Sequence, residues 1–159
     1  MHKENRIMAR AGYVIKSGCL DSVQRARKKY AQLMEPVCRE WDLTRNELDI
    51  LLFLANNPGC DRAADIVAVR GIAKSHVSLS VGNLEQRGFL MRQSNPEDRR
   101  TVRLKLTEAA MPAVSRGQAL QERFFDGVFH GITEEEMTLW QDILERTSRN
   151  VSQLEIETV

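Results

Sequence analysis

Two adjacent arginines follow a predicted turn at positions 95–100 and carry the clearest chemical signal of the chain. In "NPEDRR" the Asn-Pro pair favours a turn, and Asp98, Arg99 and Arg100 come soon after it. Arginine is planar, permanently charged and less strongly hydrated than lysine, so it suits contacts with phosphates or with a narrow groove. An exposed Asp–Arg pair can also be incidental, because such pairs add little to stability. These residues favour noncovalent binding of a polyanion.

The remaining chemistry-bearing residues form no catalytic or metal-binding pattern. The sequence has no nucleophile–base pair, no phosphate-binding glycine loop and no cluster with metal-ligand spacing. An odd number of cysteines without Cys-x-x-Cys spacing gives no disulfide framework and is typical of small buried residues in a reducing compartment. The scattered residues are His2, His76, His130, Cys19, Cys38 and Cys60. We therefore predict a protein that is not an enzyme and that holds no cofactor and no metal.

The composition is that of an ordinary globular protein. The chain has 159 residues, of which 42% are hydrophobic and 28% charged, and this fits one domain spanning residues 1–159. No window is apolar for the roughly 18 residues that a membrane span needs, and the N-terminus lacks the apolar stretch of a secretion signal. We therefore expect a cytoplasmic protein without a membrane partner.

Charge is distributed unevenly along the chain, although the net charge is only +1. Residues 1–41 and 61–107 are net basic, whereas residues 42–60 and 108–159 are net acidic. A basic segment is often no more than a solvated face. The distribution also fits a protein with one face for a polyanion and acidic surface elsewhere.

The first part of the chain predicts two helices. Apolar residues recur at three- and four-residue steps over 13–41, which indicates one long helix that Pro36 bends or interrupts near its end. Thr44 and Glu47 have the spacing of a capping box, in which each side chain bonds to the backbone of the other residue. A helix over 45–55 follows, and "NNPG" stops it.

Two short helices with a tight connection come next. "DRAADIVAVRG" predicts a helix that ends at Gly71, and "KSHVSLSVGNLEQRG" predicts a second one that ends at Gly88, with Val77, Val81 and Leu84 on one face. The pair is typical of a helix-turn-helix, in which the second helix, here called the reading helix, enters the major groove of DNA. Many short helix pairs only build a core, so this pattern alone is weak.

Strand patterns on both sides of the basic turn strengthen this interpretation. "FLMRQS" has strand character, and in "TVRLKLT" the side chains alternate: Val102, Leu104 and Leu106 face one way, and Arg103 and Lys105 face the other. A helix-turn-helix followed by a hairpin with a basic tip is a winged helix. The alternation lays one strand face on the helices and holds the arginines at the tip, where a phosphate backbone or a minor groove could meet them.

Two more helices are predicted at the C-terminal end. "EAAMPAVSRGQALQERFFDGVFHG" indicates the first, although Pro112 and Gly117 weaken it, and "ITEEEMTLWQDILERTSRNVSQLE" indicates the second. Thr133 and Glu136 repeat the spacing of a capping box. An apolar stripe follows the second helix through Met137, Trp140, Leu144, Val151 and Leu154.

Long amphipathic helices therefore flank the winged-helix segment at 42–107. That segment can bury its own core, so the apolar stripes of residues 5–41 and 108–155 need another surface. They can pack within the monomer, but a second copy of the chain is a better partner for two such flanks. We predict a homodimer joined through residues 5–41 and 108–155.

With these elements in place, the chain resembles the MarR family of transcriptional regulators over nearly its whole length. "DRRTVRLKLTEAA" is similar to the family's wing signature, Asp-x-Arg followed by Leu-x-Leu-Thr-x-x-Gly, with Ala110 in place of the last glycine. "VSLSVGNLEQRGFLMR" is similar to the family's reading helix and first wing strand. The matching residues are Val77, Val81, Leu84, Glu85, Gly88, Arg92, Asp98, Arg100, Leu104, Leu106 and Thr107.

The resemblance implies a mainly α fold with a small β-hairpin wing and flanking dimerisation helices. It implies a sequence-specific transcriptional regulator that binds double-stranded DNA as a homodimer on a pseudo-palindromic operator, and a repressor that a ligand releases. Arg100 matches the family arginine that enters the minor groove, Asp98 would orient it, and Arg99 would contact a phosphate or stay solvated. Together with the front of the reading helix, the expected DNA-binding residues are Lys74, Ser75, His76, Ser78, Leu79, Asp98, Arg99 and Arg100.

The reading helix departs from the family pattern at three positions. Ala73 replaces a capping residue worth about 1 kcal/mol. Leu79 occupies a place that is usually polar or basic, and it is either a core residue or an exposed contact to a thymine methyl group. Gly82 lies inside the helix, where glycine is destabilising by up to about 1 kcal/mol relative to alanine. The cap at Ala73 is lost unless Ser75 caps a later start of the helix. The departures at Leu79 and Gly82 concern the DNA sequence that is bound rather than binding itself.

The resemblance also implies a small-molecule effector pocket between the flanking helices and the winged-helix segment. Aromatic and methionine residues at helical spacing are also ordinary core residues. Cys19 is similar in place to the N-terminal cysteine of the family's peroxide-sensing branch, but no activating base is near it in the sequence, so redox sensing is not favoured. The candidate effector-binding residues are Tyr13, Tyr30, Met34, Trp41 and Phe53.

A second class of function is compatible with the same elements. A winged-helix dimer can act mainly as a protein-interaction module with weak or no DNA binding. The basic turn and the Asp-x-Arg motif favour DNA over this alternative.

Overall fold

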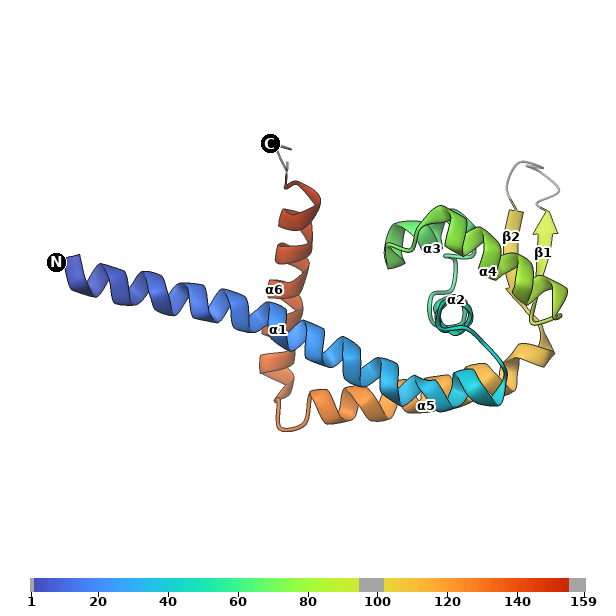
Figure 1. Ribbon diagram of the computed structural model, residues 1–159, viewed down its shortest axis with the longest axis horizontal. Helices are drawn as coiled ribbons and strands as arrows, with labels where there is room; N and C mark the ends of the chain where they lie inside the picture. Colours follow the sequence, from blue (N-terminus) through green and yellow to red (C-terminus); the bar gives the residue numbers. More distant parts are fainter. Residues whose placement is uncertain (1, 95–101, 155–159) are drawn as a thin grey trace. The chain divides into compact units, whose positions relative to one another are not determined.

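The computed structural model describes residues 2–94 and 102–154, and the side chains of residue 18 and of residues 20–94 and 102–154. The chain forms two compact units, Met1–Phe124 and Phe125–Val159, each described here by itself. Figure 1 shows the elements, which follow one another as α1 (His2–Glu40), α2 (Arg45–Asn56), α3 (Ala63–Arg70), α4 (Lys74–Gln86), β1 (Leu90–Ser94), β2 (Val102–Leu106), the 3-10 turn Glu108–Ala110, α5 (Met111–Val128) and α6 (Glu134–Ser152).

The order of these elements confirms the predicted winged helix-turn-helix, mainly α with one β-hairpin. Gly71 ends α3 in the left-handed region at φ 63°, and Gly88 follows α4 at φ 72°, where a residue without a Cβ is favoured. Both glycines therefore end their helices as the sequence predicts.

The first helix is longer than predicted and is not interrupted at Pro36. α1 includes this proline and continues to Glu40. A proline removes only its own backbone N–H from the hydrogen-bond ladder, and the next two residues, Val37 and Cys38, are buried in the core. Their burial holds the last turn of the helix in place, so the predicted interruption was wrong.

A buried carboxylate joins the start of α2 to α4. The backbone N of Glu47 donates to Thr44 Oγ1 at 3.3 Å, and the backbone N of Thr44 donates to Glu47 Oε2 at 2.7 Å, which confirms the predicted capping box. The amide of Asn83, on α4, donates to the other carboxylate oxygen at 3.1 Å. Glu47 is only 3% exposed, so this buried carboxylate links the start of α2 to α4 through hydrogen bonds.

The hairpin is attached to the rest of the winged-helix segment at its base. β1 pairs antiparallel with β2, from Leu90 opposite Leu106 to Ser94 opposite Val102. The backbone N of Leu104 donates to Asp61 O at 2.7 Å, and Leu104 itself is buried, as its place in the alternation predicts. The core that these elements enclose is formed mainly by α2, α4 and the hairpin, with Leu48, Ile50, Leu51, Leu52, Phe53, Ile66, Val77, Val81, Leu84, Leu90 and Leu104.

The second unit contains the end of α5 and all of α6. Thr133 and Glu136 form the second predicted capping box at the start of α6. The Phe129 and Trp140 rings meet edge to face, with centroids 5.2 Å apart. No described residue of α6 is buried, so the apolar stripe of this helix faces solvent in the single chain.

Gly117 lets α5 pack closely against α2. A Cβ at this position would lie 2.8 Å from Leu52 Cδ2 and 3.2 Å from its Cδ1, and Leu52 is 1% exposed. Replacing Gly117 by valine is therefore expected to lower the free energy of unfolding by about 1–3 kcal/mol, as overpacking of a core does. Thermal unfolding followed by circular dichroism measures the change. Gly127→Val is the control, because a Cβ at Gly127 would meet nothing within 4 Å; equal losses in both variants would contradict this account.

Candidate nucleic-acid interface

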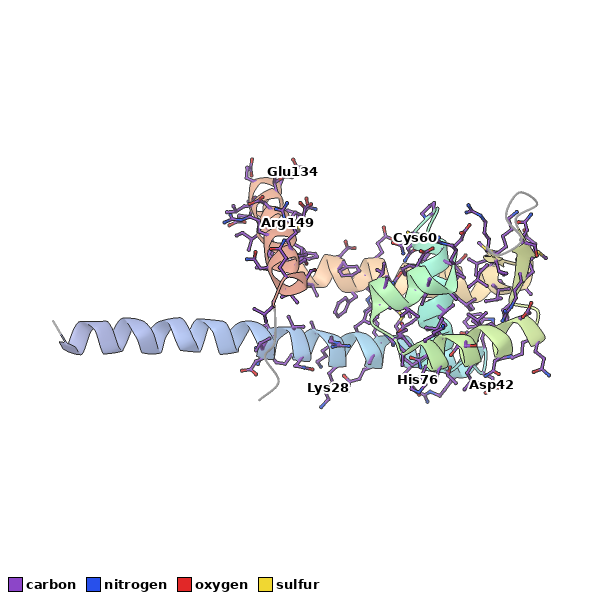
Figure 2. The ribbon with its side chains drawn as sticks, turned by 90° about the horizontal axis from the view of Figure 1, so that it is seen from above. Lys28, Asp42, Cys60, His76, Glu134 and Arg149 are labelled. Atoms are coloured by element: carbon purple, nitrogen blue, oxygen red, sulfur yellow. The ribbon has the colours of Figure 1, made fainter. Side chains whose placement is uncertain are left out.

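The reading helix, α4, has one face in the core and one face in solvent. Val77, Val81 and Leu84 are at most 2% exposed, and this fixes the rotation of the helix about its own axis. The other face presents polar side chains, of which Figure 2 marks His76 on the outside of the helix. The exposed candidates are Lys74, Ser75, His76, Ser78 and Leu79.

Among the described residues, no side chain caps the start of α4. The N-cap residue is Ala73, whose side chain has no polar atom. Its carbonyl accepts a hydrogen bond from the backbone N of Val77 at 3.1 Å. The first N–H groups of the helix therefore remain available for an external acceptor such as a phosphate.

The end of α4 is anchored to the junction between α1 and α2. The Arg87 guanidinium donates to Asp42 O at 2.7 Å and to Trp41 O at 2.6 Å. Its Cζ also lies 4.9 Å from the ring centroid of Phe89. Sequence reasoning missed Arg87, because its partners are more than forty residues away in the chain and no local pattern marks such a contact.

The candidates at the tip of the hairpin lie outside the described residues. These are Asp98, Arg99 and Arg100. The described ends of the hairpin stop at Ser94 and resume at Val102. The DNA-binding role of the three tip residues therefore stays a prediction.

Two arginines on the strands that lead to the tip are engaged in ion pairs. Arg92 Nε donates to Glu85 Oε2 at 2.8 Å, which joins β1 to α4. Arg103 donates to both carboxylate oxygens of Asp61, at 2.8 and 3.0 Å, which joins β2 to the loop before α3. These pairs orient the hairpin against the helices.

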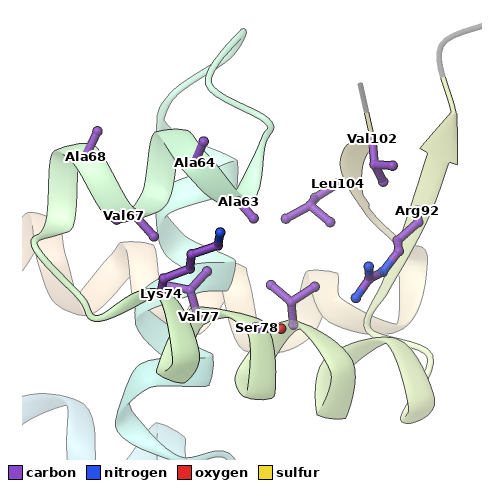
Figure 3. A pocket seen from close by; sticks show the side chains of 11 residues that line it. Ala63, Ala64, Val67, Ala68, Lys74, Val77, Ser78, Arg92, Val102 and Leu104 are labelled. Carbon is purple, nitrogen blue, oxygen red and sulfur yellow. The ribbon is translucent and has the colours of Figure 1, made fainter. Parts of the chain in front are cut away.

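A pocket of about 400 Å³ lies between α3, α4 and the hairpin (Figure 3). Its walls are mainly apolar, and Lys74, Ser78 and Arg92 supply polar groups. Two of these residues belong to the reading helix, so the pocket is part of the same surface. The apolar walls are formed by Ala63, Ala64, Val67, Ala68, Val77, Val81, Val102 and Leu104.

A second pocket, of about 430 Å³, lies between α1, α2 and the end of α3. Three arginines line it, Arg27, Arg45 and Arg70, against one carboxylate, Asp49. Arg45 Nε donates to Asp49 Oδ1 at 3.1 Å. The pocket therefore has an excess of positive charge, which suits an anionic ligand.

Tyr30 lines this second pocket as part of a directed chain of hydrogen bonds. The amide of Asn56 donates to Gln121 Oε1 at 2.8 Å, and Gln121 Nε2 donates to Tyr30 Oη at 2.7 Å. The phenol oxygen thus accepts a bond and keeps its own proton for another partner. Burial raises the pKa of Tyr30, against the opposite effect of the Gln121 hydrogen bond, so the hydroxyl remains a donor at neutral pH.

Three of the other predicted effector residues lie away from this pocket. Met34 and Phe53 are fully buried in the core, and Trp41 packs half-buried against it. Neither pocket includes these three residues. Tyr13 lies on α1, and its side chain is outside the described set.

Cys38 is not placed for thiol chemistry, and the described residues form no metal-ligand cluster. Cys38 is buried, and burial raises the pKa of its thiol, which disfavours the reactive thiolate. The side chain of Cys19 lies outside the described set. No group of three His, Cys, Asp or Glu side chains among the described residues could hold a metal ion. None of the described helices has the length and apolarity that crossing a membrane requires.

Together, α3, α4 and the β1–β2 hairpin define a winged helix-turn-helix protein. Residues 41–101 match the model of the MarR family. This match confirms the resemblance for the segment it covers, which includes the reading helix and the Asp-x-Arg part of the wing signature.

Solved structures share this fold over most of the chain. A MarR family transcriptional regulator from Listeria monocytogenes, complexed with a 26mer DNA, is 18% identical with a TM-score of 0.73, and the match covers 88% of this chain and 97% of that one. The transcriptional regulator SlyA is 21% identical with a TM-score of 0.70, covering 85% and 94%. BpsR of Bordetella bronchiseptica, whose DNA binding is regulated by 6-hydroxynicotinic acid, is 22% identical with a TM-score of 0.59, covering 80% and 91%.

Proposed function

We propose that the chain is a transcriptional regulator that binds double-stranded DNA through α4 and the hairpin. The observation that carries the proposal is the two-sided character of α4. One face is locked into the core, and the other presents Lys74, Ser75 and Ser78 to solvent. A helix that is rigid on one side and free on the other is suited to the major groove.

The electrostatics of the reading helix support the same proposal. Lys74 has no ion-pair partner among the described residues, and it stands at the uncapped start of α4. A free ammonium group beside free backbone N–H groups favours a phosphate. The hairpin would add Arg100, which matches the minor-groove arginine of the wing signature, and Arg99 as a candidate phosphate contact.

The chain would act as a homodimer. In the single chain α6 exposes Leu139, Trp140, Ile143 and Leu144, each by 44% or more. Leu20 on α1 is 70% exposed. Exposed apolar stripes of this kind mark protein–protein interfaces, and a closed two-fold dimer buries them without leaving open ends.

A dimer places two reading helices on one face of the duplex, and this fixes the form of the operator. Selecting bound duplexes from a random pool is expected to enrich an imperfect palindrome with half-sites about 10 bp apart, bound by two chains. Light scattering gives the mass of the complex, and footprinting gives the spacing. A single protected half-site bound by one chain would contradict the proposal.

A matched pair of variants connects the operator to the dimer. Ile143→Asp places a charge in the apolar stripe of α6 and should give a monomer that protects no palindrome. Gln141→Asp adds the same charge at an exposed polar position of the same helix and should remain dimeric. If Ile143→Asp stays dimeric at micromolar concentration, the stripe is not the interface.

We also propose that a small anion controls DNA binding from the pocket that Tyr30 lines, so that the protein is a repressor released by its ligand. The support is chemical: three arginines and the Tyr30 side chain line one cavity. BpsR, which has this fold, has its DNA binding regulated by a small aromatic acid. Screening small aromatic and aliphatic carboxylates for release of the selected duplex tests this part of the proposal.

A further inference from the structure

We propose that the reading helix recognises its operator through the 5-methyl group of thymine. Leu79 contacts this methyl group, and Gly82, which has no side chain, allows the DNA to come close enough. This inference rests on the proposed function and names the base that α4 reads. It follows from what the solvent face of α4 contains and from what it lacks.

The solvent face of α4 is almost without charge. Over the whole helix the Lys, Arg, Asp and Glu residues are only Lys74, in the first turn, and Glu85, near the end. Glu85 accepts the hydrogen bond from Arg92 described above. The centre of the face therefore carries no arginine, the residue that most often reads guanine through its O6 and N7 acceptors.

The arginines nearest in sequence to α4 do not supply the guanine contact that the helix itself lacks. Arg87 is held by the carbonyls of Trp41 and Asp42, and Arg70 lies over the ring of Phe53, with its Cζ 5.3 Å from the centroid. Both guanidinium groups are thus engaged with the protein. The centre of α4 must therefore read DNA without an arginine.

Leu79 is the large apolar group at that centre. It is 65% exposed, whereas the other large apolar residues of α4 are at most 2% exposed. Leu79 lies four residues after Ser75 and three before Gly82, so the three share one side of the helix. In the major groove, thymine alone among the four bases presents a methyl group, and apolar side chains contact it.

Gly82 explains how Leu79 can reach a base. A Cβ at this position would meet nothing within 4 Å, so packing within the chain does not require glycine. Gly82 also lies within α4, where glycine is destabilising relative to alanine. Its bare backbone opens the face beside Leu79, which allows the duplex to approach closely.

The test removes one methyl group from the DNA at a time. In the duplex selected by the wild-type chain, each thymine is replaced in turn by deoxyuridine, which lacks only the 5-methyl group. We expect one thymine in each half-site to respond. Deoxyuridine at this position in one half-site should raise the Kd about fourfold, because the contact with one buried methyl-sized group is lost, and the change in both half-sites should raise it about fifteenfold.

Leu79→Ala should bind the thymine duplex more weakly and should respond to deoxyuridine at that position less than twofold. Val69→Ala is the control, because Val69 is 62% exposed on α3 and belongs neither to the solvent face of α4 nor to the hairpin. This variant should keep the full increase in Kd with deoxyuridine. Gly82→Ala should unfold at the same or a higher temperature and yet bind the duplex roughly tenfold more weakly, which separates a contact with DNA from a role in folding.

The outcomes distinguish this inference from the function on which it rests. If no duplex is enriched, the proposed function fails and this inference fails with it. If a duplex is bound but no thymine responds to deoxyuridine, or if Leu79→Ala responds as strongly as the wild type, this inference alone is overturned.

Discussion

Replacing Arg100 by alanine is expected to weaken binding to most duplexes roughly tenfold or more, since loss of a wing arginine removes a charged contact in the minor groove. The same change should reduce the slope of log Kd against log salt by about one, because one fewer counterion is released on binding. Arg100 lies outside the described residues, and its role follows from the wing signature. Titration against the selected duplex and a scrambled duplex at several salt concentrations measures both effects.

Matched variants separate the wing from the reading helix. Arg116→Ala removes the same charge from an exposed position on α5 and should leave both quantities unchanged. Asp98→Ala should resemble a milder Arg100→Ala, because it only loosens the orientation of the arginine. Ser78→Ala and His76→Ala should instead change which sequences are preferred, with little change in salt slope. Wild-type binding of Arg100→Ala to both duplexes would mean that the basic tip is only a solvated turn.

Replacing Glu47 by alanine is expected to lower the free energy of unfolding by about 3 kcal/mol and the melting temperature by about 10 °C. The carboxylate is buried and accepts from Thr44 N and Asn83 Nδ2, so its removal leaves two donors without partners. Because one of them is on α4, the reading helix should also lose its fixed position, and specific DNA binding should fall more than binding to a scrambled duplex.

Glu136→Ala provides the comparison for Glu47→Ala. Glu136 occupies the same place in the capping box at Thr133, but it is exposed, and among the described residues it accepts only from the backbone N of Thr133. Its loss should lower stability by only about 1 kcal/mol. Thermal melts of the two variants decide whether Glu47 also links α2 to α4. Equal decreases in melting temperature would mean that Glu47 acts only as a helix cap.

Local patterns in the sequence were enough to predict the elements and much of the core. The capping boxes at Thr44 and Thr133, the terminal glycines at Gly71 and Gly88, and the burial of Leu104 depend on residues a few positions apart, and each is confirmed. Val102, predicted on the same strand face as Leu104, is 38% exposed. Periodicity alone also placed Val77, Val81 and Leu84 on the buried face of α4. Such features are visible without the fold because their partners are neighbours in the chain.

Features that depend on distant partners could not be predicted. The bond from Asn83 to Glu47 and the bonds from Arg87 to Trp41 and Asp42 join residues far apart in the sequence. For the same reason the aromatic and methionine candidates for the effector pocket separate in the structure: Met34 is fully buried, whereas Tyr30 faces a cavity. Composition can nominate such residues, but only packing assigns them to the core or to a pocket.

The exposure of Leu79 shows where a sequence pattern leaves a real choice. A leucine is usually a core residue, whereas the angular position of Leu79 lies away from Val77 and Leu84, so a core residue and a solvent-facing contact both remained open. The structure places it on the solvent face, 65% exposed. A core of Val77, Val81 and Leu84 already fills the inner face of α4, so no space remains there for a further leucine.

Titration of the full chain with the selected duplex and with a scrambled duplex, from low to physiological salt, tests the central claim most directly. The account predicts that both duplexes bind at low salt, that log Kd rises linearly with log salt concentration, and that the selected duplex is preferred by about a thousandfold or more at physiological salt. Absence of affinity for either duplex even at low salt would contradict the account and would favour a winged-helix dimer whose partner is a protein.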